Sequence, residues 1–165
     1  MGEASRRKKE RREGNGDPIA AIPGGPYLQA AFFCEKILVE QDSVVSFIRQ
    51  VDRLTTTASG PAVPASMPTT TFTTFLAIAL KSGEARGTHD IKLVRERPSG
   101  IRDNQPVFSV RLLFEGEDRG VGLHGPANLT FEEEGLYWFD LYVDETLMTR
   151  MPFRVIYQQA VARTG

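Results

Sequence analysis

Three side chains in this sequence could support nucleophilic catalysis or metal binding: the thiol of Cys34 and the imidazoles of His89 and His124. A cysteine nucleophile needs a base within hydrogen-bonding reach, and either histidine could supply it. A zinc site would need two or three further ligands, but the chain has a single cysteine and no HExxH motif. Cys34 lies in the apolar run AAFFC, which favours a buried structural thiol over a reactive one.

Acidic residues gather at two places near the C-terminus, Glu132–Glu134 and Asp144–Glu145. Calcium binds carboxylates of this kind, but it needs about six to eight oxygens in one compact cage. A pair of carboxylates could also hydrolyse a glycosidic bond if a cleft held them across from each other. No spacing in the sequence brings two of them together, so we predict solvated acidic turns and expect no metal or cofactor.

The glycine-rich run GVGLHG, residues Gly120–Gly125, matches the GxGxxG pattern of dinucleotide-binding proteins. That pattern binds pyrophosphate only where a strand precedes it and a helix N-terminus follows it. Here Pro126 follows, and the next residues, NLTFEEEG, are typical of a short strand. We therefore predict a plain glycine-rich connection between strands, with His124 in it.

Length and composition indicate one folded domain with a sizeable core, since the chain has 165 residues and an apolar fraction of 41%. The formal net charge of −1 argues against a molecule that binds polyanions over its whole surface. A single cysteine excludes an internal disulfide framework and fits a reducing compartment. The sequence has neither an apolar segment after its basic N-terminus nor an apolar run of about 18 residues, so we expect a cytoplasmic protein without a membrane span.

A basic cluster, RRKKERR, stands near the N-terminus. Its cations could contact nucleic acid or another anionic surface through phosphate attraction, which carries no sequence information. No aromatic residue alternates with these charges, as a platform for single strands would require. A solubilising tail is the favoured interpretation, and salt-sensitive binding that disappears on removal of Met1–Gly16 would support the alternative. The possible anion contacts are Arg6, Arg7, Lys8, Lys9, Arg11 and Arg12.

The chain divides into a charged, Gly/Pro-rich tail (residues 1–26), a folded domain (27–158) and a short C-terminal tail (159–165). Within the domain, about seven short strands separated by turn signals, without alternating helices, predict an all-β, immunoglobulin-like antiparallel β-sandwich. The expected elements are two strands within 27–54 joined by a turn at 41–43, a Pro/Thr-rich loop at 55–70, a hairpin of 72–81 and 88–96 around the turn SGEARG, a strand at 107–116, a glycine-rich connection at 117–128 and a closing hairpin.

The closing hairpin, residues 136–157, is rich in aromatic residues, which strand alternation divides between two faces. One face is uniformly apolar and should point into the core: Tyr137, Phe139, Leu141 and Val143. The other face combines a charge with amphipathic aromatics, which suits a partly solvated surface: Leu136, Trp138, Asp140 and Tyr142.

Two residues of this hairpin predict local features. Pro152 cannot donate a ladder hydrogen bond, so the returning strand should lie at an edge there or shift its register. Tyr137 follows the turn before a late strand, where it is either a tyrosine corner bonded back to the backbone or a simple core residue.

Two parts of the sequence resemble a small bacterial family of unknown function with a predicted immunoglobulin-like sandwich. The run from Phe131 to Asp144, followed by PFRV, is similar to the end of that family. The run FFCEKILVEQDSVVSFI is similar to its beginning, and the resemblance covers about Leu28 to Tyr157. It implies the sandwich fold, and it implies no functional residue because the family has no assigned activity.

The leading functional hypothesis is a non-catalytic interaction or accessory module, which binds an unknown protein partner or itself through end loops or an edge strand. The candidate contacts are Pro61, Pro64, His124, Trp138 and Tyr142. The alternatives are a small hydrolase-type enzyme, which would use Cys34 with a histidine or a carboxylate pair, and weak nucleic-acid binding by the basic tail.

Overall fold

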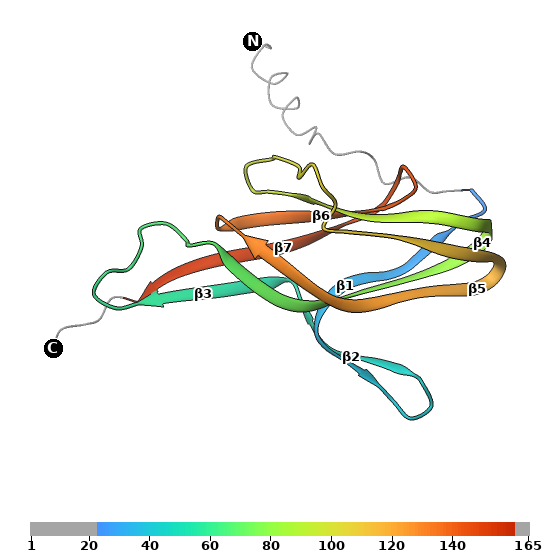
Figure 1. Cartoon of the computed structure of the whole chain (residues 1–165), viewed down its shortest axis with the longest axis horizontal. Coiled ribbons are helices and arrows are strands. Elements are labelled where there is room, and N and C mark those ends of the chain that lie inside the picture. The colour runs from blue at the N-terminus through green and yellow to red at the C-terminus, as the bar shows by residue number, and fades with distance from the viewer. Residues whose placement is uncertain (1–22, 161–165) are drawn as a thin grey trace, which may run out of the picture.

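The computed structural model describes residues 23–160, and the elements in this range are all β-strands (Figure 1). The strands are β1 (Tyr27–Val39), β2 (Val45–Val51), β3 (Arg53–Ser59), β4 (Thr70–Glu96), β5 (Phe108–Phe131), β6 (Gly135–Val143) and β7 (Thr146–Ala160).

The strands form one hydrogen-bonded sheet that folds into two layers because β4 and β5 are long and bend together. In the first layer, β2 and β1 lie beside the part of β4 before Ser82 and the part of β5 after Arg119. In the second layer, the remaining parts of β5 and β4 continue into β6, β7 and β3. The described strands pair antiparallel except for β3 with β7, which are parallel. This architecture confirms the predicted immunoglobulin-like sandwich.

The bend between the layers depends on glycine. The β4–β5 register shifts on both sides of Gly83, whose φ is 59°. A Cβ on Gly83 would lie 2.3 Å from the carbonyl oxygen of Gly24, which accepts a hydrogen bond from the backbone N–H of Glu84. A side chain at Gly83 would therefore clash with the backbone in addition to straining this left-handed conformation.

The same bend contradicts two predicted elements. Residues 72–81 and 88–96 were expected to pair around SGEARG, but they are consecutive parts of β4 and do not pair with each other. The predicted glycine-rich connection at 117–128 is likewise wrong, because those residues lie within β5. Glycines that resemble turn signals in the sequence instead let a long hairpin bend while its strands stay paired.

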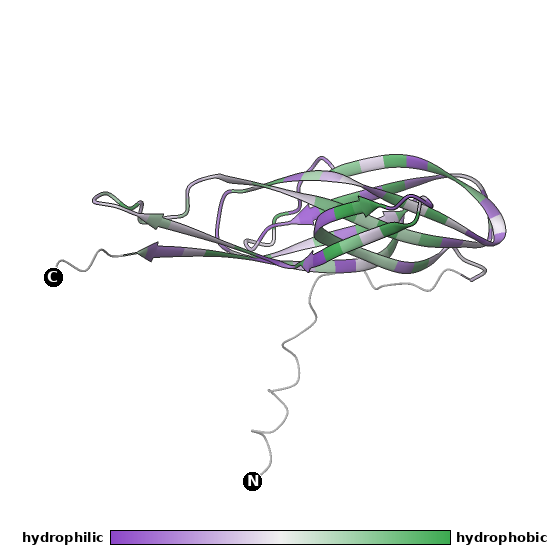
Figure 2. Cartoon of the chain, turned by 90° about the horizontal axis from the view of Figure 1, so that it is seen from below, coloured by the Kyte–Doolittle hydropathy of each residue, from purple (hydrophilic) through white to green (hydrophobic). Residues whose placement is uncertain are grey.

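The core between the layers consists largely of aromatic rings. Phe33 of β1 contacts Phe139 and Phe153 of the second layer, with ring centroids 5.0 and 5.8 Å apart. Phe131 stacks on Phe153 at 5.3 Å. The predicted inward set of β6 is buried as expected: Tyr137, Phe139, Leu141 and Val143. Figure 2 shows the corresponding alternation of hydrophobic and hydrophilic segments along the strands.

Tyr137 forms the tyrosine corner that was one of its two predicted roles. Its hydroxyl donates to the carbonyl oxygen of Glu133 at 2.8 Å and accepts from the backbone N–H of Glu133 at 3.3 Å. The guanidinium of Arg95 lies 5.9 Å from the centre of the ring. The ring therefore fills the core while its hydroxyl fixes the turn before β6.

Pro152 lies at a local edge, as predicted. The β7 strand pairs with β6 on one side, where Trp138 faces Pro152. On the other side its pairing with β3 begins only at Arg154. Because no described strand pairs with β7 at Pro152 on that side, the absent N–H of this proline costs no ladder hydrogen bond.

Three segment boundaries differ from the predicted ones. Residues 55–59, assigned to the Pro/Thr-rich loop, belong to β3 because they pair with the end of β7. Gly25 and Pro26, assigned to the N-terminal tail, are buried. The last strand runs to Ala160, two residues past the predicted end of the domain.

Candidate functional site

Cys34 is buried in β1, as its apolar surroundings in the sequence favoured. Its carbonyl oxygen accepts a hydrogen bond from Thr74 Oγ1 at 2.7 Å. Burial raises the pKa of the Cys34 thiol, and a hydrogen bond from the backbone N–H of Lys36 offsets only part of this effect. A reactive cysteine has a lowered pKa and some exposure, so this environment has the opposite properties.

His89 lies in the second layer and is bonded to the tip of the β6–β7 hairpin rather than to Cys34. Its Nδ1 is 2.9 Å from Asp144 Oδ2, and its ring forms a T-shaped pair with the Phe114 ring, with the centroids 5.0 Å apart. The other oxygen of Asp144 accepts from the backbone N–H of Asp90 at 3.0 Å. Burial raises the pKa of Asp144, but the hydrogen bonds from His89 and Asp90 outweigh it, so the pKa is lowered overall.

His124 projects from β5, not from a loop as predicted. Its ring lies 6.4 Å from that of Phe47 in β2, and its side chain is exposed. Within residues 23–160, neither histidine is hydrogen-bonded to the Cys34 thiol. The structure thus does not assemble the proposed cysteine–histidine pair.

Four of the five acidic residues predicted near the C-terminus have separate hydrogen-bond or ion-pair partners, and Asp144 is the one bonded to His89. Glu132 pairs with Arg97, and Glu134 Oε2 accepts from the backbone N–H of Tyr157 at 3.3 Å. Glu145 lies 3.4 Å from Lys92 Nζ. Residues 23–160 contain no group of three or more His, Cys, Asp or Glu side chains that could hold a metal ion.

Trp138 and Tyr142, two predicted partner contacts, flank a charged cluster on the outer face of β6. Between them lies Asp140, which is fully buried although it was predicted on a partly solvated face. Its Oδ1 is 2.7 Å from Arg150 Nε, and its Oδ2 is 2.5 Å from Arg102 Nη2. This face was expected to be partly solvated, and long arginine side chains from β7 and from the loop after β4 cover it.

The charged cluster also contacts both aromatic side chains. The guanidinium of Arg150 lies 5.1 Å from the centre of the Trp138 ring, and Arg102 interacts with Tyr142. Glu96 completes the cluster, with one carboxylate oxygen 2.8 Å from Arg150 and 3.3 Å from Arg102. Both aromatic side chains are half-buried, which leaves little of them for a partner.

Pro61 and Pro64 lie in the exposed segment between β3 and β4. The carbonyl oxygen of Pro64 accepts hydrogen bonds from Tyr157 Oη and Gln159 Nε2, both at 2.8 Å. These bonds hold the segment against the end of β7. The basic residues of the predicted anion contact, Arg6–Arg12, lie outside the described residues.

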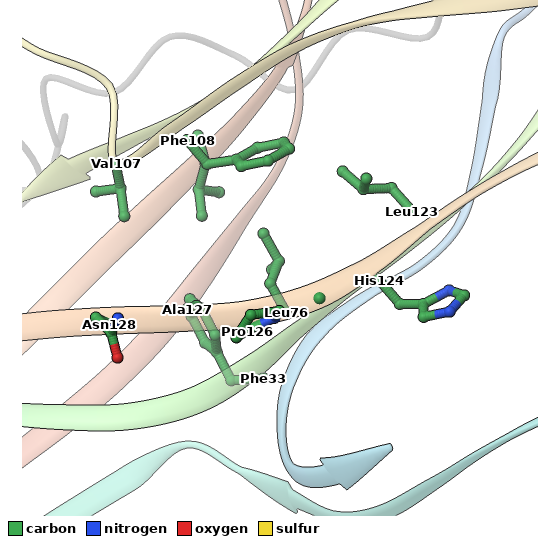
Figure 3. Close-up of a pocket in the computed structure, with 11 residues that line it drawn as sticks. Phe33, Leu76, Val107, Phe108, Leu123, His124, Pro126, Ala127 and Asn128 are labelled. Carbon is green, nitrogen blue, oxygen red and sulfur yellow. The ribbon is translucent and has the colours of Figure 1, made fainter. Parts of the chain in front are cut away.

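An apolar cavity of about 310 Å³ opens between the layers, beside β5 (Figure 3). Its walls include Phe33, Leu76 and Phe108, and its polar lining residues are His124 and Asn128. The His124 ring points away from the apolar side chains, and Asn128 already accepts a hydrogen bond from Thr73. No sequence pattern predicted this cavity, because its lining combines residues of β1, β4 and β5.

The clearest exposed feature is a hairpin arm, residues 35–49, in which β1 and β2 continue beyond the sandwich (Figure 1). The β1 strand pairs with β4 only as far as Cys34, and from there on β2 is its sole strand partner in the structure described. Of eight exposed large hydrophobic residues in the described chain, five lie on this arm: Leu38, Val39, Val44, Phe47 and Ile48. The apolar runs KILV and VVSFI, on either side of a turn, were the available sequence signal.

The arm has a defined tip and a defined root. At the tip, Ser43 has a φ of 66° and donates its N–H to the carbonyl oxygen of Glu40, as in a three-residue hairpin loop with a left-handed last residue. At the root, Arg49 has a φ of 52° and its guanidinium lies 2.8 Å from the Glu35 carboxylate. Such a backbone conformation is unusual for arginine and marks the point where the arm leaves the sandwich.

These features define an immunoglobulin-like sandwich with an apolar arm. Residues 29–156 match the model of the Family of unknown function (DUF6941), and the chain belongs to that family. Among curated proteins none matches the chain. The chain is also similar to the crystal structure of an immunoglobulin-like protein from Pseudomonas aeruginosa, with 14% sequence identity, a TM-score of 0.35, and coverage of 82% of this chain and 99% of that one. In the part of the chain that the structure describes, no helix is long and apolar enough to cross a membrane.

Proposed function

We propose that this protein is a non-catalytic interaction module that binds a protein partner or a second copy of itself through the β1–β2 arm. The main support is the concentration of exposed apolar side chains on the arm. Val39 is 67% exposed and Val44 is 54% exposed. Clustered exposed apolar residues are typical of interaction sites on soluble proteins.

The backbone of the arm supports the same proposal. A two-stranded hairpin is only marginally stable in water, so an arm that leaves its sheet gains stability when another surface covers it. The β2 strand ends the strand order of the sheet, and β1 has no second strand neighbour beyond Cys34 among the described residues. Unpaired strand edges accept additional strands through main-chain hydrogen bonds.

The chemistry of the polar residues also favours a non-catalytic role. The buried Cys34 has a raised thiol pKa, and His89 is bonded to Asp144. The aromatic face that looked most promising in the sequence is covered, since Arg150 lies on Trp138. The arm is therefore a better candidate for contact than Trp138, Tyr142 or the proline-containing segment.

Site-specific photo-crosslinking in cells that make the natural protein tests this proposal. A photoreactive phenylalanine analogue replaces Val39 on the β1 strand of the arm, which is 67% exposed, or Leu113 on β5, which is 62% exposed and serves as the matched control. We expect discrete crosslinked species from position 39 and none from position 113. Equal labelling at both positions, or none at position 39, would contradict a binding role for the arm.

A further inference from the structure

We propose that the partner of the arm is a second copy of this chain, which pairs antiparallel with the free edge of β1 around Leu38. This inference rests on the proposed function, because it names the partner of the same arm. The two arms would form a continuous four-stranded sheet, ordered β2, β1, β1 and β2, about a two-fold axis.

The hydrogen-bonding pattern of the hairpin shows which backbone groups are free. The backbone N–H of Glu40 donates to the carbonyl oxygen of Val44 at 2.8 Å, so these two residues form a hydrogen-bonded pair. Bonded and non-bonded pairs alternate along an antiparallel ladder. Leu38 therefore bonds to Ser46 across the hairpin, whereas the N–H and C=O groups of Ile37 and Val39 point away from β2.

The sequence of this edge is self-complementary. Residues 36–40 read KILVE, a cation and an anion on either side of three apolar residues. When Leu38 faces Leu38 of a second copy, Ile37 faces Val39 and Lys36 faces Glu40, each twice. The free groups of Ile37 and Val39 then exchange four main-chain hydrogen bonds, and the exposed Leu38 and Val39 side chains acquire apolar neighbours.

Charge selects this register. Lys36 is exposed and forms no ion pair with any residue that the structure describes. Glu40 accepts a hydrogen bond from Ser46 through Oε1, which leaves Oε2 for a second donor. Lys36, Leu38 and Glu40 are two residues apart and therefore lie on the same face of the strand, so both ion pairs would flank the central leucines. A shift of two residues would place Lys36 opposite Leu38 and lose both pairs.

The root of the arm makes this edge accessible. The left-handed Arg49, paired with Glu35, directs the hairpin away from the sandwich (Figure 1). Beyond the Cys34–Phe75 pair, β1 and β4 no longer share a ladder. The free edge of β1 therefore begins where the arm departs.

Sedimentation equilibrium of the full chain over a concentration series tests the pairing. We expect a reversible dimer whose dissociation constant rises about tenfold or more in Lys36→Glu and in Glu40→Lys, since each change puts like charges opposite each other twice. The double variant K36E/E40K should restore dimerisation, because it reverses both partners. Circular dichroism checks that the variants fold. Failure of the double variant to recover, with folding intact, would overturn the proposed register.

Disulfide trapping provides an independent test. Leu38→Cys places two thiols across the axis in a non-hydrogen-bonded pair, the closest antiparallel arrangement. We expect rapid oxidation to a covalent dimer, and little in the natural chain, whose one cysteine is buried. Val44→Cys, which lies directly before β2 on the other side of the hairpin turn, is the matched control and should remain monomeric. Crosslinking at position 44 but not at 38 would place the contact on β2 and overturn the proposal.

The two proposals fail in different ways. If the purified chain is a monomer and position 39 crosslinks to a different protein, the second-copy partner is wrong and the binding role of the arm stands. If the chain is a monomer and position 39 crosslinks to nothing, both proposals are wrong.

Discussion

The outer face of β6 and the β1–β2 arm both carry bulky apolar side chains on the solvent side of a strand, yet only the arm leaves them exposed. On β6, Arg150 covers Trp138, and a buried carboxylate, Asp140, anchors the arginines. On the arm no charged side chain performs this role, and Val39 and Val44 remain more than half exposed. Aromatic content in a sequence therefore predicts contact surfaces poorly unless the covering side chains are known.

The largest effect should come from removing the anchor of the covered face. Asp140→Ala leaves Arg102 and Arg150 without their shared buried carboxylate. Loss of one partner of a buried ion pair typically costs about 3 kcal/mol or more, and here, among the described residues, Glu96 alone would remain to compensate two guanidinium groups. Urea denaturation should show this decrease in the free energy of unfolding.

The matched control is Glu132→Gln, which removes a half-exposed partner of Arg97 on the same layer. Exposed pairs contribute about 1 kcal/mol or less, so this variant should remain close to the natural protein. Equal losses in the two variants would show that the Asp140 cluster does not hold this face together.

A smaller loss is expected from Tyr137→Phe, which keeps the buried ring and removes the hydroxyl of the tyrosine corner. The carbonyl of Glu133 loses a hydrogen bond of 2.8 Å, which corresponds to about 1 kcal/mol of stability. Thermal unfolding monitored by circular dichroism measures the change. An unchanged midpoint would mean that packing alone fixes this turn.

A pH-dependent effect is expected from Asp144→Asn. Asparagine, like aspartate, tolerates the observed φ of 53°, so the change removes the charge without straining the backbone. The pKa of Asp144 is lowered in the fold, so its carboxylate stabilises the protein above the ordinary value of 3.8. This contribution is lost as the pH falls through the lowered pKa. Unfolding midpoints of the natural protein and the variant should differ at pH 6 and converge in strong acid, whereas a constant difference would contradict this linkage.

The smallest effect on folding should come from the arm itself. Val39→Thr replaces one exposed methyl group by a hydroxyl, so the stability of the dilute monomer should change by about 0.5 kcal/mol or less. Amide hydrogen exchange should show faster exchange on the arm than on β6 in the same sample. A larger loss of monomer stability would mean that the arm is packed rather than open.

Strand alternation was sufficient to predict the inward residues of β6, because each successive side chain points to the opposite face. The missing N–H of Pro152 predicted a strand edge or a register shift at that position, and the structure shows an edge. Strand alternation could not predict the burial of Asp140, since the covering Arg102 comes from a loop 38 residues away in the chain. The continuous β4 was also missed, because glycines that permit a turn equally permit a bend within a paired hairpin.

The sequence by itself determined the all-β class and the aromatic core of the closing hairpin, because these depend on local periodicity and composition; it favoured the burial of Cys34 without deciding it. Only the tertiary structure decided which apolar segments stay uncovered. Trp138 and Val39 look alike in the sequence as apolar residues of strands. Trp138 has a paired strand on each side and the Arg150 guanidinium over its ring, whereas nothing in the described chain covers Val39. Exposure depends on which distant segments arrive beside a residue, and local pattern carries no information about that.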